Sequence, residues 1–411
     1  MSVEELESHI AKLSADIDTQ KEVLRQLEIQ KSAAQRQLNA IHDPVARLPL
    51  EISSEIFIRC IPSERPGPEP RVAPVLLLNI CNAWTDIALS TPALWAAVHL
   101  DCHDQADEVL KTWLQRANRR PLSISLRKSL NDGVAAILRQ YAKQLKHLEF
   151  CEEEHDVDSL TKESTFSCVE SLTFGSPWDD PAEEFNSLSL GHVMGLLCRA
   201  PNLVECYFLN VSIRIPAMAP ERMLLPNLRR LKFGNADPDH PHGGDDLLDY
   251  LSLPTLEELA VPLIDIFPHK FSLFLERSLP PLRRLVLGCR DIQMPSTLNE
   301  WLFILPSLID LELCTRGGPF ADDFFSALVD SPSEFLPNLR SLKMQHHYLT
   351  HSVLAHVPRV LSARRPRLVC FHLNASSAER PSPDVHDALL NLATDGMEIY
   401  IGNDRTNYVS L

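Results

Sequence analysis

A six-residue apolar pattern recurs nine times after residue 140 and constrains the fold more than any other feature of the sequence. The copies are LKHLEF, VESLTF, LVECYF, LRRLKF, LEELAV, LRRLVL, LIDLEL, LRSLKM and LVCFHL, which begin at residues 145, 169, 203, 228, 256, 282, 308, 339 and 368. Repetition at intervals of 24 to 34 residues is typical of arrays in which each unit stacks on its neighbours. The sequence therefore predicts a solenoid over residues 99–411, closed by a C-terminal cap.

Prolines and helical segments separate these copies. In seven of them, a proline stands two residues before the first apolar position, where it ends a helix and allows a strand to begin: Pro201, Pro226, Pro254, Pro280, Pro306, Pro337 and Pro366. Helical spacing occurs in the connecting segments HVMGLLCRA, DDLLDYLSL, FSLFLERSL, STLNEWLFIL and DDFFSALV. Strand and helix in alternation predict an α/β fold with parallel strands and helical crossovers.

The array resembles leucine-rich repeats, which implies a curved sheet with helices on its outer face. Regular repeats of that family carry Asn or Cys at the ninth position. Here the ninth positions hold Glu153, Pro177, Val211, Ala236, Ile264, Arg290, Arg316, His347 and Ser376. We therefore expect an irregular leucine-rich-repeat solenoid with uneven curvature.

Side chains alternate along a strand, so the third and fifth positions of each copy should share the concave face. The third positions of five successive copies alternate in sign and are expected to pair across neighbouring strands: Glu205, Arg230, Glu258, Arg284 and Asp310. The fifth positions are less balanced and predict a target-binding patch that includes Tyr207, Lys232, Val286, Glu312 and Lys343, with Ala260 between them. An ordinary solvated sheet face is the alternative.

The amino-terminal segment, residues 1–43, carries a seven-residue repeat. Its positions are Leu6, Ile10, Leu13, Ile17, Gln20, Leu24, Leu27, Lys31, Ala34, Leu38 and Ile41. This spacing is typical of a coiled coil and predicts either a homodimer through residues 6–41 or one long helix packed against its own chain. The helix should end near His42, because Pro44 disfavours helical geometry in the residue before it.

Residues 44–98 predict three short helices. Leu48, Ile52 and Ile56 share a helical face in DPVARLPLEISSEIFIRCIP, and a proline-rich stretch from Pro62 to Pro74 predicts an exposed loop. Helical spacing resumes in VLLLNICNAWTDIALSTPALWAAVHL, where Thr91 is placed to cap a last short helix. A segment this short buries too little apolar surface to offset the chain entropy that it loses on folding. We therefore expect another protein to cover part of its surface.

The stretches LPLEISSEIF and ICNAWTDIALSTPALW resemble the F-box, and the arrangement is similar to fungal F-box proteins that begin with a coiled helix. The resemblance implies docking onto the Skp-type linker subunit of a cullin-RING ubiquitin ligase. The implied docking residues are Leu48, Pro49, Glu51, Ile52, Ile56 and Phe57, with Trp84 as core tryptophan and Pro92, Leu94 and Trp95 as closing motif. The insertion at residues 62–74 departs from the commoner F-box, and a helical hairpin that caps the next domain is the alternative.

Charge and motifs exclude several classes of function. A formal charge of -16 would repel a phosphate backbone, so no nucleic-acid partner is expected. No secretory leader and no apolar run of bilayer-spanning length occur, which predicts a cytoplasmic or nuclear protein without membrane contact. Ten scattered cysteines without CxxC favour free, mostly buried thiols.

Catalytic signatures are absent as well. No phosphate-binding or nucleophile-elbow motif occurs, so we expect no catalytic residue, cofactor or metal. Two clusters could ligate a metal but are more simply polar loops: His240, His242, Asp245 and Asp246, and the later His346, His347, His351 and His356.

Together these patterns predict a substrate-receptor subunit of a ubiquitin ligase. Residues 44–98 would bind the linker, and residues 99–411 would bind an unknown protein target. The alternatives are an interaction scaffold outside ubiquitination, and a metal-dependent hydrolase built around His240 and His242.

Overall fold

The computed structural model describes residues 3–62, 65–102, 105–127, 130–150, 160, 164–175, 186–214, 221–234, 244–263, 266–289, 295–315, 320–349, 351–378, 380–403 and 405–409. The chain is α/β and forms two compact units. Unit 1 comprises residues 1–100 and 105–123, and unit 2 comprises residues 101–104 and 124–411. Each unit is described by itself below.

Unit 1 is mainly helical. Its elements are α1 Val3–His42, η1 Val45–Arg47, α2 Leu50–Arg59, η2 Leu76–Asn79, α3 Asn82–Leu89, η3 Pro92–Trp95, the strand β1 Ala97–Asp101, whose last residue belongs to unit 2, and α4 Ala106–Ala117, where η denotes a 3-10 helix. As expected, α1 ends at His42, just before Pro44. The apolar stripe of α1 is exposed at Ile10, Leu24 and Leu38, so this chain itself does not bury it.

Aromatic side chains form the core of unit 1. Phe57 of α2 is wholly buried, and its ring lies 4.9 Å from that of Trp84 of α3. Trp95 is also wholly buried, packs edge-on against Trp113 of α4 at 5.0 Å, and donates its indole N–H to the Ala88 carbonyl at 2.9 Å. Burial of groups this large contributes about 3–5 kcal/mol per side chain when judged by truncation to alanine.

Two details of unit 1 differ from the sequence expectation. The proline-rich segment was expected to be an exposed loop, but Pro66, Ala73 and Pro74 are buried. Proline rings are apolar and bring no backbone N–H that would need a partner, so they can pack without a hydrogen-bonding cost. Thr91 precedes a helix but does not cap it; its hydroxyl donates to the Ile87 carbonyl instead, at 2.7 Å.

Unit 2 contains a large sheet whose strands are mostly parallel. In hydrogen-bonded order from β2 they are β2 Leu122–Arg127, β3 Leu145–Phe150, β4 Ser171–Gly175, β6 Glu205–Leu209, β9 Arg230–Phe233, β11 Glu258–Val261, β12 Arg284–Cys289, β13 Asp310–Thr315, β14 Ser341–Leu349, β15 Cys370–Ala378, β16 Glu398–Asn403 and the antiparallel β17 Thr406–Asn407. Two small parallel sheets pair β5 Asn186–Ser189 with β7 Val211–Arg214, and β8 Met223–Leu224 with β10 Leu251–Ser252.

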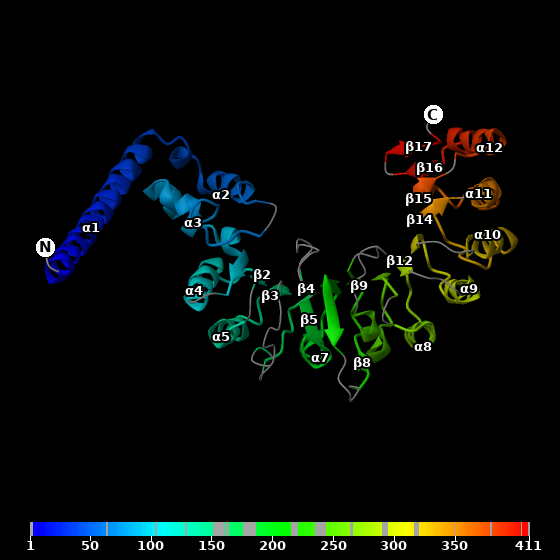
Figure 1. The fold of residues 1–411 in the computed structure, drawn as a ribbon, viewed down its shortest axis with the longest axis horizontal. Helices are drawn as coiled ribbons and strands as arrows, with labels where there is room; N and C mark the ends of the chain where they lie inside the picture. Colours follow the sequence, from blue (N-terminus) through cyan, green and yellow to red (C-terminus); the bar gives the residue numbers. More distant parts are fainter. Residues whose placement is uncertain are drawn as a thin grey trace. The chain divides into compact units, whose positions relative to one another are not determined.

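Helices follow the strands, as the alternating pattern predicts. They are α5 Asp132–Gln140, α7 Leu190–Arg199, η4 Asp245–Tyr250, α8 Pro268–Ser278, α9 Pro295–Phe303, α10 Phe320–Asp330, α11 His351–Ala363 and α12 Pro383–Thr394. Helices α8 to α12 lie along one side of the strands (Figure 1). One expectation needs correction, because DDLLDYLSL forms the 3-10 helix η4 and the short strand β10 rather than one α-helix.

The first, fourth and sixth positions of each repeat build the core between sheet and helices. Four sixth-position rings, Phe150, Phe174, Phe208 and Phe233, stack along neighbouring strands with centroids 5.9, 5.1 and 5.2 Å apart. All four are at most 2% exposed. Stacked rings at this spacing contribute attraction beyond their buried area and hold the strands in register.

A hydrogen-bond ladder joins the turns that precede the strands. In six of the repeats, the side chain just after the proline that precedes the strand donates to a backbone carbonyl of the preceding repeat. The bonds are Asn202 to Ser167 at 2.8 Å, Asn227 to Pro201 at 3.0 Å, Thr255 to Pro226 at 2.8 Å, Ser307 to Leu282 at 2.9 Å, Asn338 to Pro306 at 2.9 Å and Arg367 to Pro337 at 3.0 Å. Each such bond contributes about 1 kcal/mol, so the ladder helps to hold each repeat against its neighbour.

No helix in the described part of the chain combines the length and apolar composition needed to cross a bilayer.

Candidate functional site

An apolar surface lies at the start of α2. We call it the docking ridge and define it by Leu48, Leu50, Ile52 and Ile56, which are 41%, 48%, 51% and 39% exposed. Pro49 and Glu51 between them are exposed as well. Single exposed apolar residues are common on proteins, but here Ile52 and Ile56 lie one turn apart on the same side of α2, and Leu48 and Leu50 stand at its start. Exposed apolar residues gathered in this way are typical of surfaces that partners cover.

Polar contacts on the opposite side of α2 hold the docking ridge outward. Ser53 is wholly buried, and its hydroxyl lies 3.2 Å from the Pro49 carbonyl and 3.3 Å from the Val45 carbonyl. The Ser54 hydroxyl lies 2.8 Å from that of Thr91. Because Ser53 and Ser54 face inward, Ile52 and Ile56 on the other side of the helix face solvent.

Phe57 does not belong to the docking surface that the sequence predicted. The helix turns it inward, where it is wholly buried against Trp84. A wholly buried phenyl ring contributes more to stability than a partly exposed one, because nearly all its apolar surface leaves water. Phe57 therefore supports α2 from beneath, and the other five predicted docking residues lie on the surface.

The predicted core tryptophan is held by a carboxylate. The Trp84 indole N–H donates to Asp43, and the Cys81 sulfur lies 3.6 Å from the same carboxylate. Asp43 follows α1 directly, so this contact joins the end of α1 to α3. In the closing motif, Leu94 and Trp95 are wholly buried and Pro92 is half-buried.

The second candidate surface is the sheet face opposite helices α8 to α12, which we call the open face. The strand register aligns the fifth positions of its repeats into one continuous row: Tyr207, Lys232, Ala260, Val286, Glu312, Lys343, His372 and Tyr400. Parallel strands lie about 4.8 Å apart, so residues 25 to 31 positions apart in sequence become near neighbours.

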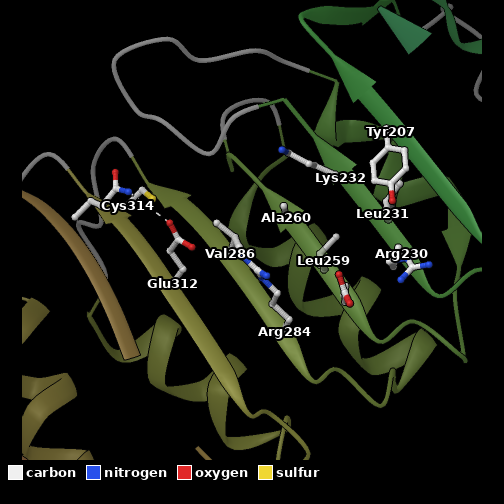
Figure 2. Close-up of a pocket in the computed structure, with 12 residues that line it drawn as sticks. Tyr207, Arg230, Leu231, Lys232, Leu259, Ala260, Arg284, Val286, Glu312 and Cys314 are labelled. Atoms are coloured by element: carbon white, nitrogen blue, oxygen red, sulfur yellow. Dashed lines mark hydrogen bonds between the residues drawn. The ribbon is translucent and has the colours of Figure 1, made fainter. Parts of the chain in front are cut away.

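A hollow of about 540 Å³ occupies this face. Figure 2 shows the side chains that project from β6, β9, β11, β12 and β13 into it, while the helices lie behind the strands. Its lining residues are Tyr207, Arg230, Leu231, Lys232, Glu258, Leu259, Ala260, Arg284, Val286, Glu312, Cys314 and Gln345. The lining combines an aromatic ring, small apolar groups and charges of both signs, as protein-binding surfaces do.

The predicted target-binding residues divide between two hollows. Tyr207, Lys232, Val286 and Glu312 line the larger one, whereas Lys343 lines an adjoining hollow of about 110 Å³ that shares Glu312. Lys343 and Glu312 are neighbours in the register of β13 and β14. The strands therefore bring all five residues to one side of the sheet.

Tyr207 is held by a small charged network. Its hydroxyl donates to Glu205 Oε2 at 3.0 Å, and the same carboxylate forms an ion pair with Arg230. Burial, followed by the negative charge of Glu205, raises the pKa of Tyr207 to about 12, so the phenol stays protonated and neutral at pH 7. A ring oriented in this way loses less side-chain freedom on binding than a mobile one.

The alternating third-position row is in register, but it does not pair at every step. Along Glu205, Arg230, Glu258, Arg284 and Asp310 the structure has an ion pair only at Glu205–Arg230. Other pairs form instead at the second positions, Lys146–Glu170 at 3.0 Å and Arg229–Glu257 at 3.1 Å. The expectation that the whole third-position row would pair is therefore wrong. Glu258, Arg284 and Asp310 form no ion pair with one another, and their charges remain on the open face.

The side chains of most of the histidines in the two clusters considered in the sequence are not described by the structure. His240 and His242 lie outside the described residues, as do the side chains of His346, His347 and His351. Asp245 is wholly buried at the start of η4. Of the eight cysteines whose side chains the structure describes, only Cys81, Cys206 and Cys314 are buried, so the expectation of mostly buried thiols is wrong.

Compared with models of protein families and with curated proteins, the chain matches none of them. Its function must therefore be inferred from its own surfaces.

Proposed function

We propose that the protein is a substrate-receptor subunit of a cullin-RING ubiquitin ligase, in which unit 1 docks onto a Skp-type linker. The observation that carries this proposal is the docking ridge. Its four apolar side chains remain exposed at the start of a helix that Leu48 and Pro49 directly precede, while Phe57 and Trp95 are wholly buried in the core of unit 1. That combination of a formed core and an uncovered apolar helix face supports binding of a partner along α2.

The open face of unit 2 would bind the protein to be ubiquitinated. No covalent chemistry is assigned to this chain in the proposal. Its contribution is proximity, because a tethered target has a high effective concentration near the ubiquitin-carrying subunits. Such a role places the protein in the cytoplasm or nucleus. The exposed stripe of α1 suits self-association of the receptor through residues 6–41.

Reconstitution from purified components tests the docking step. The full chain should co-elute with a Skp-type linker subunit in gel filtration and recruit the cullin through it. Failure to bind the linker while targets are still captured would instead favour the interaction scaffold without a ligase role.

We expect the double variant Tyr207→Ala/Lys232→Ala to weaken target capture at least about tenfold, since aromatic anchors and their charged neighbours carry much of the energy of interfaces. Quantitative mass spectrometry of proteins captured by the full chain measures this. Tyr141→Ala/Lys143→Ala is the matched control, because these residues follow α5 and do not line the hollow. Equal capture by both variants would remove the open-face hollow from the proposed target site.

A further inference from the structure

A cluster of three metal-binding side chains lies at the C-terminal end of the open face. Cys370 Sγ, a ring nitrogen of His372 and a carboxylate oxygen of Glu398 all lie within 4.8 Å of one another. His372 Nε2 and Glu398 Oε1 are 3.0 Å apart. No metal was expected from the sequence, because β16 lacks the leucine pattern and Glu398 had no predicted neighbour.

The sheet itself positions the three ligands. Cys370 and His372 occupy the third and fifth positions of the last repeat, at the start of β15, so both project to the same face. Glu398 stands beside Cys370 in the parallel register of β15 and β16. Rigid strands hold a site more reproducibly than loops do, and here two adjacent strands supply every ligand.

The ligand types and spacing suit zinc. Tetrahedral zinc has bonds of about 2.3 Å to sulfur and about 2.0–2.1 Å to nitrogen or oxygen, which places ligand atoms roughly 3.4–3.6 Å apart. The His372–Glu398 distance is already close to this value, and the partly exposed Cys370 and Glu398 side chains can turn toward a common ion. A thiolate, a neutral imidazole and a carboxylate carry two negative charges, which the ion neutralises.

We propose that Cys370, His372 and Glu398 bind one zinc ion, leaving its fourth coordination position open at the open face. The ion would bridge β15 and β16 directly. A site with three protein ligands retains a water or accepts a donor atom from another molecule. Lys343 is the register neighbour of His372, and its positive charge repels a cation at this site. The negative charges of both Cys370 and Glu398 are therefore needed to hold the ion.

Cysteine binds zinc as the thiolate, so binding of the ion releases the thiol proton of Cys370 to solvent.

Cobalt substitution tests the site on the full chain. After metal is removed with a chelator under reducing conditions, titration with Co²⁺ should saturate at one ion per chain and produce thiolate-to-cobalt charge-transfer absorption. Zinc should displace the cobalt and abolish this absorption. Absence of stoichiometric binding would overturn the proposal.

Three single variants locate the ion. Cys370→Ser should remove the charge-transfer absorption, and His372→Gln and Glu398→Gln should each weaken zinc binding at least about 100-fold, since loss of a mere supporting partner already costs about 10–100-fold. Cys168→Ser and His386→Gln are controls, because both residues are exposed or partly exposed and lie outside the cluster.

Either of two results would assign the ion elsewhere and end the proposal: charge-transfer absorption that survives Cys370→Ser, or zinc affinity unchanged by both His372→Gln and Glu398→Gln. Thermal unfolding of each apoprotein variant confirms that it is folded. All three ligands are outside the buried core, so two variants remain decisive if one fails to fold.

Discussion

The double variant Ile52→Asp/Ile56→Asp should lose binding to a Skp-type linker by more than about 100-fold. Burial of one isoleucine side chain contributes about 1.5–3 kcal/mol, and two carboxylates in an apolar interface add the cost of removing charge from water. A loss of about 3 kcal/mol or more corresponds to a factor of at least 100 in affinity. Calorimetry or surface plasmon resonance with the purified linker measures it.

The same variant should fold normally. Ile52 and Ile56 are 51% and 39% exposed, so their replacement changes the free energy of unfolding by only about 0.5 kcal/mol. Phe57→Asp offers no comparable test, because that ring is wholly buried and a carboxylate there would unfold unit 1. The Ile52→Asp/Ile56→Asp variant therefore tests docking without the loss of structure that Phe57→Asp would cause.

Val109→Asp and Leu273→Asp are the matched controls for this prediction. Both replace an exposed apolar residue of another helix, 37% and 47% exposed, with the same charge. They should leave linker affinity unchanged. A folded Ile52→Asp/Ile56→Asp variant that binds the linker as tightly as the unmodified chain would refute docking through α2.

Arg364→Met should destabilise unit 2 by about 3–5 kcal/mol, because its removal leaves buried carbonyls without donors and each of these costs about 1–3 kcal/mol. Arg364 is only 4% exposed. Its guanidinium donates to the carbonyls of Leu328 at 2.7 Å, Phe335 at 2.6 Å and Leu336 at 2.9 Å. Burial lowers the pKa of Arg364 to about 10, so it remains charged at pH 7 and can make these bonds.

Urea unfolding followed by circular dichroism measures the effect of Arg364→Met. Arg359→Met is the control in α11, the helix that ends just before Arg364, because Arg359 is 71% exposed and its contact with Asp330 is 4.0 Å long. The control should change the free energy of unfolding by less than about 0.5 kcal/mol. An Arg364→Met protein as stable as this control would show that the carbonyls between α10 and β14 find other partners.

Arg277 of α8 forms similar hydrogen bonds to backbone carbonyls at an earlier position in unit 2. Its guanidinium donates to the carbonyls of Leu251 at 2.8 Å and Leu248 at 2.9 Å, and burial lowers its pKa. In both places an arginine near the end of a helix binds the backbone of the preceding connection. Neither was recognised in the sequence, because arginines near helix ends are ordinarily solvent-exposed.

The docking ridge was only partly predictable. The spacing of Ile52 and Ile56 correctly placed them on one helical face, because 3.6 residues per turn follows from backbone geometry alone. Leu48 was wrongly included in that face, because it precedes α2 in extended backbone. Helical spacing does not say which neighbouring residues the rest of the chain will cover. Phe57 lies beside the same face in sequence, yet α3 supplies Trp84 as a packing partner and buries it.

By itself, the sequence determined the alternation of strands and helices, the inward leucines and phenylalanines, and the set of side chains that share the open face. The direction in which each of these side chains points depends only on the periodicity of its own strand or helix, and the repeats show that periodicity directly. Tertiary structure alone decided that charges pair at second positions, that Arg364 is buried among carbonyls, and that Glu398 lies beside Cys370 and His372. Each of those outcomes depends on atoms brought together from distant segments, and their distances are set by strand register and packing rather than by local periodicity.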